Sequence, residues 1–287
     1  MTSATATPAG RGRSNRLMSG AGVYAAAALL AAFVLGPVLW MVVTALKPRD
    51  EVFTSPPHWI PHHPTFENFG AALDPTFLRF MGNSLLVCTG ATLLCVALAL
   101  LASYTLSRPS GRMRHSVLVV VLVSQLLPQA VLLVPLYRSA EELGLLNSYA
   151  GLVVVYLTFT LPVAMWLLHG FIAAIPAELE EAAQADGLSS FRAFLTVIVP
   201  LARPGIAATA AFVFFTAWQD FMFALVFLTD EAKRTLPLGV LGYMGQYTVQ
   251  WGQLMAASTL LLLPIMALFV AVQRHFVAGL TVGAVKG

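Results

Sequence analysis

Apolar residues along this chain gather in six runs that are separated by polar or proline-rich segments. The runs lie near residues 21–46, 83–106, 116–137, 149–171, 205–228 and 254–273. Each is close to the ~20 residues that a membrane-spanning helix needs. The pattern therefore predicts an all-α fold, a polytopic membrane helix bundle of about six transmembrane helices.

The two ends of the chain differ from this apolar part. Residues 1–20 are mostly small, polar and basic, and we expect them to form a disordered N-terminus. The first apolar run is longer than the ~7–15 residues of a signal-peptide core and lacks a clear cleavage site, so it is expected to be a retained anchor. We expect one transmembrane domain over residues 21–276 and a C-terminal tail over residues 277–287.

Composition supports lipid as the main solvent. Hydrophobic residues make up 58% of the 287 residues and charged residues 10%, whereas soluble domains carry about 25% charged residues. The net charge of +3 includes no basic run of the kind that nucleic acid binding needs. Cys88 and Cys95 are two helical turns apart, about 10 Å, which is too far for a disulfide. We interpret both as small packing residues.

The placement of Lys and Arg predicts the orientation. If the N-terminus is cytoplasmic, ten of the 16 basic residues lie on that side and six on the other. The short loop 107–115 carries three arginines and no acid. Since cytoplasmic loops are enriched in basic residues, we expect both termini and segment 172–204 to be cytoplasmic.

Segment 176–204 predicts a short helix, a tight turn and a second helix at the membrane surface. Pro176 suits the first position of a helix, and the glutamates at 178, 180 and 181 complement its N-terminus. Helical spacing places one set of side chains on a shared face: Leu179, Ala182, Ala183 and Asp186. Two alanines there would let another backbone approach closely. A plain surface helix that joins two spans is the alternative interpretation.

The second half of this segment contains the stop and restart signals. Gly187 can adopt the left-handed conformation that ends a helix. Ser189 or Ser190 can cap a second helix, which we expect to end before Pro200.

The segment resembles the EAA loop of binding-protein-dependent ABC importers. The matching residues are Glu181-Ala182-Ala183, Asp186-Gly187, Phe194, Ile198, Pro200 and Pro204, whereas Leu188 replaces an alanine common in the family. In that family the loop forms a coupling helix that docks into a cleft of the ATP-binding subunit. The resemblance implies a set of docking residues here: Leu179, Glu181, Ala182, Ala183, Asp186 and Gly187.

Other stretches are similar to carbohydrate-uptake permeases, in particular to the smaller permease of the maltose-transporter type. These stretches are Leu46-Lys47-Pro48, Pro57-x-Trp59-x-Pro61, 64–69, Asn83-Ser84-Leu85, Trp218-Gln219-Asp220-Phe221 and the tail 279–287. The resemblance covers nearly all of the chain after residue 20. It implies that the tail, including Gly283 and Lys286, contacts the ATPase dimer.

The resemblance also implies the assembly and its task. The expected partners are a second homologous permease, two ATP-binding subunits and an extracytoplasmic solute-binding protein, in a bacterial inner membrane. The complex would import a mono-, di- or oligosaccharide or a glycerol-phosphate-type ligand by alternating access. The sequence has no Gly-x-x-x-x-Gly-Lys-Ser/Thr loop. We therefore expect no catalytic residue and no cofactor in this chain, with ATP and Mg²⁺ bound by the partner ATPases.

Trp218, Gln219 and Asp220 are candidates for the translocation cavity. Asp220 is the one acidic residue within the predicted spans, and an intramembrane carboxylate is a functional candidate by default. Its other interpretation is structural, as an acid near the outer end of the fifth span that is hydrogen-bonded to a neighbouring helix. Gln219 replaces the family's Asn, which weakens any transfer of a specific sugar contact.

Three alternatives are weaker. His58, His62 and His63 are irregularly spaced in a proline-rich loop without a nearby cysteine, so we predict no metal site there. An ion-coupled transporter would need several ionisable groups at mid-membrane. A membrane enzyme would need a catalytic constellation, and His169, the histidine close to a span end, has no nucleophile at a recognisable spacing.

Overall fold

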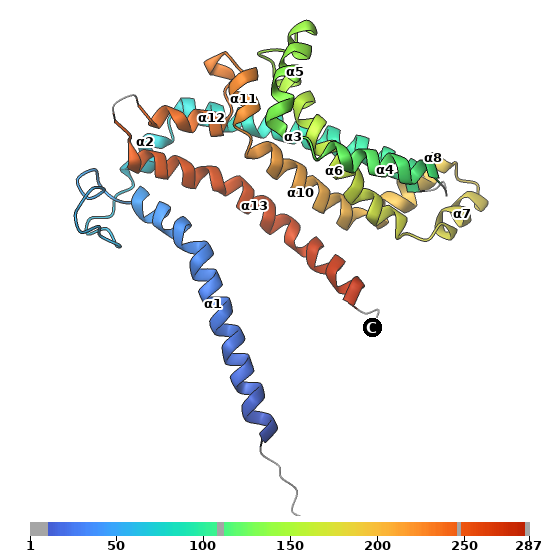
Figure 1. The fold of residues 1–287 in the computed structure, drawn as a ribbon, viewed down its shortest axis with the longest axis horizontal. Coiled ribbons are helices and arrows are strands. Elements are labelled where there is room, and N and C mark those ends of the chain that lie inside the picture. The colour runs from blue at the N-terminus through green and yellow to red at the C-terminus, as the bar shows by residue number, and fades with distance from the viewer. Residues whose placement is uncertain (1–10, 108–111, 246–247, 285–287) are drawn as a thin grey trace, which may run out of the picture. The chain divides into compact units, whose positions relative to one another are not determined.

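The computed structural model describes residues 11–107, 112–245 and 248–284, with side chains described for residues 22–107, 116–245 and 248–273. The secondary-structure elements of these residues are helices joined by turns and irregular segments (Figure 1). The all-α prediction is confirmed.

Four of the described helices are long and apolar enough to cross a membrane. Two further pairs of helices are bent, and if each pair counts as one span the total is up to six. The four are α1 (Arg11–Ala45), α3 (Pro75–Ser107), α6 (Tyr149–Ala173) and α13 (Trp251–Ala284). One pair is α4 (Arg112–Ser124) with α5 (Gln129–Glu142), bent by 95°. The other joins residues Ser190–Leu201 to α10 (Arg203–Trp218) with a bend of 77°.

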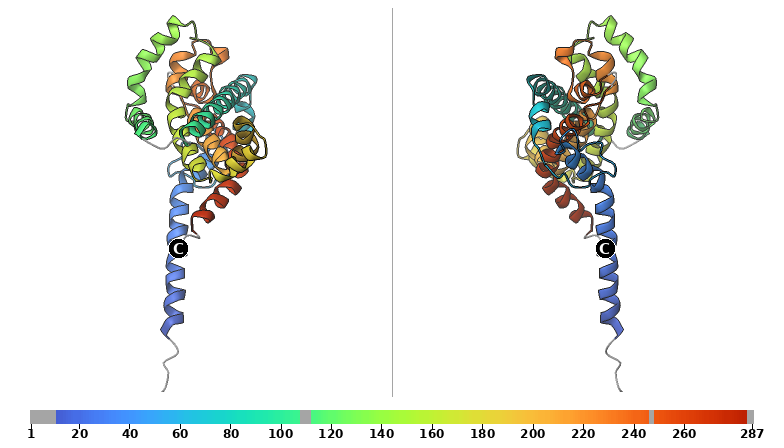
Figure 2. Two further views of the ribbon diagram at one scale, coloured as in Figure 1. Left: turned by 90° about the vertical axis from the view of Figure 1, so that its right-hand side faces the viewer. Right: turned by 90° about the vertical axis from the view of Figure 1, so that its left-hand side faces the viewer.

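The third and fifth predicted spans are broken rather than straight. The bend between α4 and α5, visible as the green arc in Figure 2, falls just before Pro128. Proline has no N–H to donate and disfavours helix in the residue before it. The fifth run, predicted as one helix over 205–228, ends as α10 at Trp218 and restarts as α11 (Met222–Phe227).

Contacts divide the chain into two compact units. Unit 1 comprises residues 1–72 and 249–259, and unit 2 comprises 73–248 and 260–287. In unit 1, the side-chain amide of Asn68 in α2 (Glu67–Ala72) donates to the carbonyls of Ala45 and Lys47, each at 2.8 Å. This amide fixes α2 to the end of α1. A Cβ on Gly252 would lie 2.6 Å from Asn68 Oδ1, so the close approach requires glycine.

The core of unit 2 is formed by α3, α6 and α10, which run side by side in Figure 1. Small and branched side chains fill the contact: Cys95, Ala99, Ala164, Leu168 and Val213. Small residues let membrane helices approach closely. Cys88 and Cys95 are buried and unpaired, as predicted.

Polar bonds hold the α12 end of unit 2. The amide of Asn83 in α3 donates to the carbonyls of Ala232 and Arg234, both at 2.9 Å, and accepts from the hydroxyl of Tyr149 at 2.8 Å. Beside it, the hydroxyl of Ser84 accepts the N–H of Leu236 at 2.7 Å. These bonds attach η2 (Glu231–Lys233) and α12 (Leu236–Val240) to α3.

The two ends differ from the sequence prediction where they are described. The backbone is helical from Arg11, although residues 1–20 were expected to be disordered. At the other end α13 continues through Ala284, so the backbone of the predicted tail over 277–284 is helical. Residues 1–10 and 285–287, including Lys286, lie outside the described residues.

Candidate functional site

The predicted helix–turn–helix is present, and its first helix is α7 (Glu178–Ala185). Gly187 has φ +93°, the positive value expected for a stop. Its N–H donates to the carbonyl of Gln184 at 3.0 Å, and the N–H of Leu188 donates to that of Ala183 at 3.1 Å. These two bonds define a Schellman motif with Gly187 at C′. Pro176 lies two residues before the first helical residue, Glu178, and precedes the N-cap Ala177 instead of occupying the predicted first helical position.

One face of α7 is held inside the protein. Glu180 is 6% exposed, and its carboxylate accepts hydrogen bonds from the hydroxyl of Tyr104 in α3 and, at 3.3 Å, from the amide of Gln184. The Tyr104 ring contacts Phe194 at a centroid distance of 4.6 Å. A buried carboxylate needs such donors to be stable. The inner face of α7 is thus bonded to α3.

Ala183 belongs to this inner face. It is 9% exposed, whereas the sequence analysis placed it on one face with Leu179, Ala182 and Asp186. Position 183 lies three residues after Glu180 and shares its side of the helix, which faces α3. The other proposed docking residues remain at the surface: Leu179 (45% exposed), Glu181, Ala182, Asp186 and Gly187.

The second helix follows the predicted cap but not the predicted end. Ser189 accepts the N–H of Arg192 at 3.4 Å and starts α8 (Ser190–Ala193). The path then becomes a π-helix, η1 (Phe194–Ile198), and continues as α9 (Val199–Leu201). Pro200 therefore lies within a helix rather than beyond it. Pro200 occupies the second position of α9, directly after the π-helix.

A hydrophobic cluster fixes this segment to the spans. Its buried members come from α6, η1 and the turn before α10: Ile172, Phe194, Ile198 and Ala202. Tyr104 and Leu100 of α3 pack against the cluster. The cluster thus packs η1 and the turn before α10 against α3 and α6.

Asp220 occupies the break between α10 and α11. Its carboxylate accepts the N–H of Phe223 at 3.3 Å and of Ala224 at 3.0 Å, and the hydroxyl of Tyr156 donates to it at 3.0 Å. The carboxylate thus caps α11 and joins it to α6. This geometry favours the structural interpretation of Asp220.

Trp218 and Gln219, which precede Asp220 in the sequence, differ in exposure. Trp218 is 1% exposed, its indole N–H donates to the carbonyl of Leu261 at 3.2 Å, and its ring stacks on Phe214 at 5.5 Å. A ring with no free surface cannot contact a sugar in this conformation, so Trp218 acts here as a packing residue. The side chain of Gln219 is exposed, which keeps it available for a ligand.

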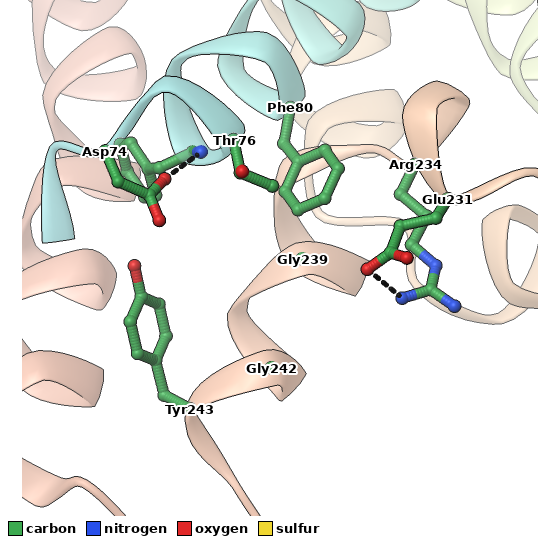
Figure 3. A pocket seen from close by; sticks show the side chains of 9 residues that line it. Asp74, Thr76, Phe80, Glu231, Arg234, Gly239, Gly242 and Tyr243 are labelled. Carbon is green, nitrogen blue, oxygen red and sulfur yellow. Dashed lines mark hydrogen bonds and ion pairs between the residues drawn. The ribbon is translucent and has the colours of Figure 1, made fainter.

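A polar hollow of about 180 Å³ lies at the α12 end of unit 2 (Figure 3). Glu231 and Arg234 form an ion pair at 3.5 Å on one side. On the other side the Tyr243 hydroxyl points toward Asp74, and burial, with a smaller effect of the Asp74 carboxylate, raises the pKa of Tyr243. Ligand pockets usually measure roughly 300–1,000 Å³, so this hollow is too small for an oligosaccharide.

The fold brings His169 beside Ser107, which the sequence spacing did not indicate. Its Nδ1 lies 3.0 Å from the hydroxyl oxygen of Ser107, and that hydroxyl also donates to the carbonyl of Ser103 at 2.6 Å. The serine hydroxyl thus has a backbone acceptor as well as the imidazole within hydrogen-bond distance.

Two site residues were missed by the sequence analysis. Tyr104 lies 76 positions from Glu180, so no local pattern connects them. Helical spacing could have indicated that Glu180 shares a face with Ala183. With three glutamates in the first turn, however, the sequence does not show which of them is buried. At the C-terminal end, Gly283 lies in α13, and Lys286 lies outside the described residues.

Comparisons with known proteins agree with this arrangement. Residues 95–282 match the family described as binding-protein-dependent transport system inner membrane component. The chain is 38% identical to the diacetylchitobiose uptake system permease protein DasC of Streptomyces coelicolor, over 88% of this chain and 91% of that protein. It is 36% identical to the trehalose/maltose transport system permease protein MalG of Thermococcus litoralis, over 91% and 95%.

A solved structure has the same fold. A chain of a bacterial ABC transporter involved in the import of the acidic polysaccharide alginate superposes with a TM-score of 0.80 at 20% identity, covering 94% of this chain and 100% of that one. The family match covers more than half of the chain, and the relatives are similar over nearly their full length. The chain therefore belongs to the binding-protein-dependent transport system inner membrane components and is a multi-pass permease subunit of an ABC transporter.

Proposed function

We propose that this permease imports a sugar that a solute-binding protein delivers, with α7 as the element that docks into an ATP-binding subunit. Support for a sugar comes from the relatives, whose names refer to diacetylchitobiose, trehalose/maltose and sulfoquinovosyl glycerol. The proposed substrates are mono-, di- or oligosaccharides or a glycerol-phosphate-type ligand.

The proposed assembly contains a second homologous permease and two ATPase subunits, which bind ATP and Mg²⁺. The sequence of this chain has no phosphate-binding loop, so hydrolysis belongs to those partners. The substrate path would run between the two permeases. Gln219 is the residue of this chain that we assign to that path.

The observation that carries the docking proposal is the two-faced environment of α7. Its inner face is hydrogen-bonded to α3 through Glu180, while Leu179 and Ala182 are exposed on a helix with a fixed end at Gly187. Exposed apolar side chains such as Leu179 and Ala182, flanked by acids, are more stable in contact with another protein than in contact with water. Docking there would pass ATP-driven movement through Tyr104 to the α3–α6 core, which is the step that alternating access requires.

The orientation follows from the same proposal. If α7 meets a cytoplasmic ATPase, segment 172–204 is cytoplasmic, and both termini lie on that side, in agreement with the distribution of Lys and Arg. We also propose that the C-terminal end, with Gly283 and Lys286, contacts the ATPase dimer.

A matched pair of substitutions at one exposed position tests the docking. Ala182→Glu places a larger charged side chain in the proposed interface, whereas Ala182→Ser adds one small polar atom. We expect Ala182→Glu to abolish co-purification of the ATPase subunits and sugar-stimulated hydrolysis in liposomes, and Ala182→Ser to retain both. Normal ATPase recruitment by Ala182→Glu would exclude α7 as the docking element.

A further inference from the structure

The segment between α1 and α2 in unit 1 brings together three side chains that the sequence does not group. Glu51, His58 and His62 each offer a ligand atom, and these atoms lie within 4.8 Å of one another. We infer that this loop binds a divalent transition-metal ion, with zinc as the best match, through Glu51, His58 and His62.

The distances are close to those of a metal site. Zinc binds histidine nitrogen at about 2.0–2.1 Å and carboxylate oxygen at about 2.0–2.2 Å, so two ligand atoms of one tetrahedral ion lie roughly 3.3–3.5 Å apart. His62 Nδ1 and Glu51 Oε1 are 3.8 Å apart, a few tenths of an ångström beyond this separation. The widest separation that the cluster allows, 4.8 Å, would need to shrink by about 1.4 Å. Rotation of the side chains about their χ angles can supply a change of that size.

Burial of two of the ligands favours an ion over water. Glu51 is 7% exposed, although a carboxylate is seldom buried without a cation. His58 Nδ1 is buried and has no hydrogen-bond partner among the described residues. A buried polar atom without a partner is unfavourable, and coordination to a metal removes that cost. His62 remains accessible, with 61% of its side chain exposed, and would close the site from the solvent side.

The surrounding loop holds the ligands in place. The backbone N–H of His62 donates to Glu51 Oε2 at 3.1 Å, which leaves Oε1 for the ion. The ammonium of Lys47 donates to the carbonyl of His58 at 2.6 Å and lies 4.5 Å from the centroid of the Trp40 ring. Hydrogen bonds of this kind, made by groups around the ligands, orient metal ligands. The Glu51 carboxylate offsets the repulsion between Lys47 and a divalent cation.

The ligand set indicates the class of ion. Two imidazoles and one carboxylate suit Zn²⁺, and also Co²⁺ or Ni²⁺, better than Ca²⁺ or Mg²⁺, which prefer oxygen ligands. Three protein ligands leave a fourth tetrahedral position for water or for a donor from another subunit. Bound metal would join positions 51, 58 and 62 and restrict the loop that connects α1 to α2. The alternative is a simple acid–histidine contact between Glu51 and His62, which would bind no metal.

The irregular spacing is no obstacle in this fold. The ligands are separated by seven and four residues along the chain, and no metal site was predicted at the histidines because no cysteine completes them. The missing partner is a glutamate, Glu51, which the fold returns to the histidines. That residue could not be singled out among the acids of the sequence.

The experiment uses the complete transporter in nanodiscs, purified with a tag that contains no histidine. Zinc affinity is measured by competition with a chromophoric chelator, and Co²⁺ is added separately to record the visible spectrum of a tetrahedral site. Variants His58→Gln and His62→Gln each remove one ligand. His63→Gln is the matched control, because His63 is exposed in the same loop and lies outside the cluster.

We expect the wild type and His63→Gln to bind zinc with equal affinity and to give the same Co²⁺ spectrum. Removal of a hydrogen-bond partner of a metal ligand typically costs about 10–100-fold in metal affinity, so loss of a direct ligand should cost at least about tenfold. Equal affinity in His62→Gln and His63→Gln, or no competition for zinc by the wild type, would overturn the proposal. His62→Gln decides the outcome if His58→Gln fails to assemble, because the His62 side chain is exposed and its backbone bond remains.

Discussion

Replacing Gly187 is expected to loosen the turn that ends α7 without a steric clash. A Cβ at this position would meet no atom within 4 Å, so any cost arises from the backbone at φ +93°. Non-glycine residues pay roughly 1–2 kcal/mol for a left-handed conformation. Because each ~1.4 kcal/mol changes an equilibrium tenfold, Gly187→Ala should raise the population of the opened turn about 5- to 30-fold.

Hydrogen–deuterium exchange measures this population. The N–H of Leu188, which donates to Ala183 across the turn, should exchange about 5- to 30-fold faster in Gly187→Ala. Gly187→Val should exchange faster still, because β-branched side chains tolerate positive φ least. Gly187→Asn should lie between glycine and alanine, since asparagine adopts this conformation more readily. ATPase recruitment should fall in the same order.

Gly170→Ala is the matched control. Gly170 also has no atom within 4 Å of an added Cβ, but it lies in the helical backbone of α6. Alanine is favoured over glycine in a helix by roughly 0.5–1 kcal/mol, so this variant should be neutral or slightly stabilised. Unchanged exchange at Leu188 in Gly187→Ala would refute the reasoning, and a defect of equal size in Gly170→Ala would show that any added methyl group has the same effect.

Further predictions concern the anchor, the cap and the orientation. Tyr104→Phe removes a hydrogen bond to the buried carboxylate of α7 and should destabilise its position by about 1.5–3 kcal/mol, measured as faster deuterium uptake in α7. Asp220→Ala removes the acceptor of two N–H groups and should lower stability by about 1–3 kcal/mol in thermal unfolding, whereas a transport defect in Asp220→Asn at unchanged stability would contradict a purely structural role. In a cysteine-free background, single cysteines at Ile60 and Glu142 should react with an impermeant maleimide on whole cells, and one at Glu181 only after permeabilisation. Labelling of the last on intact cells would reverse the orientation.

Much of the fold could be predicted because membrane helices depend on long apolar runs. The six runs locate the helices well, and the stop at Gly187 and the cap at Ser189 were recognised from local chemistry alone. The 95° bend before Pro128 could not be predicted from the run 116–137, because a proline indicates a possible break but not its angle, which depends on packing.

The candidate site was less predictable because its contacts join distant segments. Helical spacing placed Ala183 on the same face as Leu179 and Ala182, but Ala183 is buried in the structure. The hydrogen bond between Glu180 and Tyr104 marks the face of α7 that is turned toward α3. Trp218 was assigned to a cavity from its motif, whereas its burial follows from Leu261 in another helix. Local patterns indicate what a residue can do, and only tertiary contacts determine what it meets.

The bonds of Asn83 and Ser84 have a consequence for biogenesis. Their partners at Ala232, Arg234 and Leu236 follow about 150 residues later in the chain. At a synthesis rate of about 5–20 residues per second, the ribosome needs roughly 8–30 seconds to deliver them. During that interval the amide and the hydroxyl must be hydrated or sheltered by the insertion machinery, since lipid offers them no partner. The hydrogen bonds of Asn83 and Ser84 in α3 can thus form only after the fifth apolar run has been synthesised. A nascent chain truncated before residue 232 would leave these polar groups unpaired, and we expect membrane quality control to recognise it.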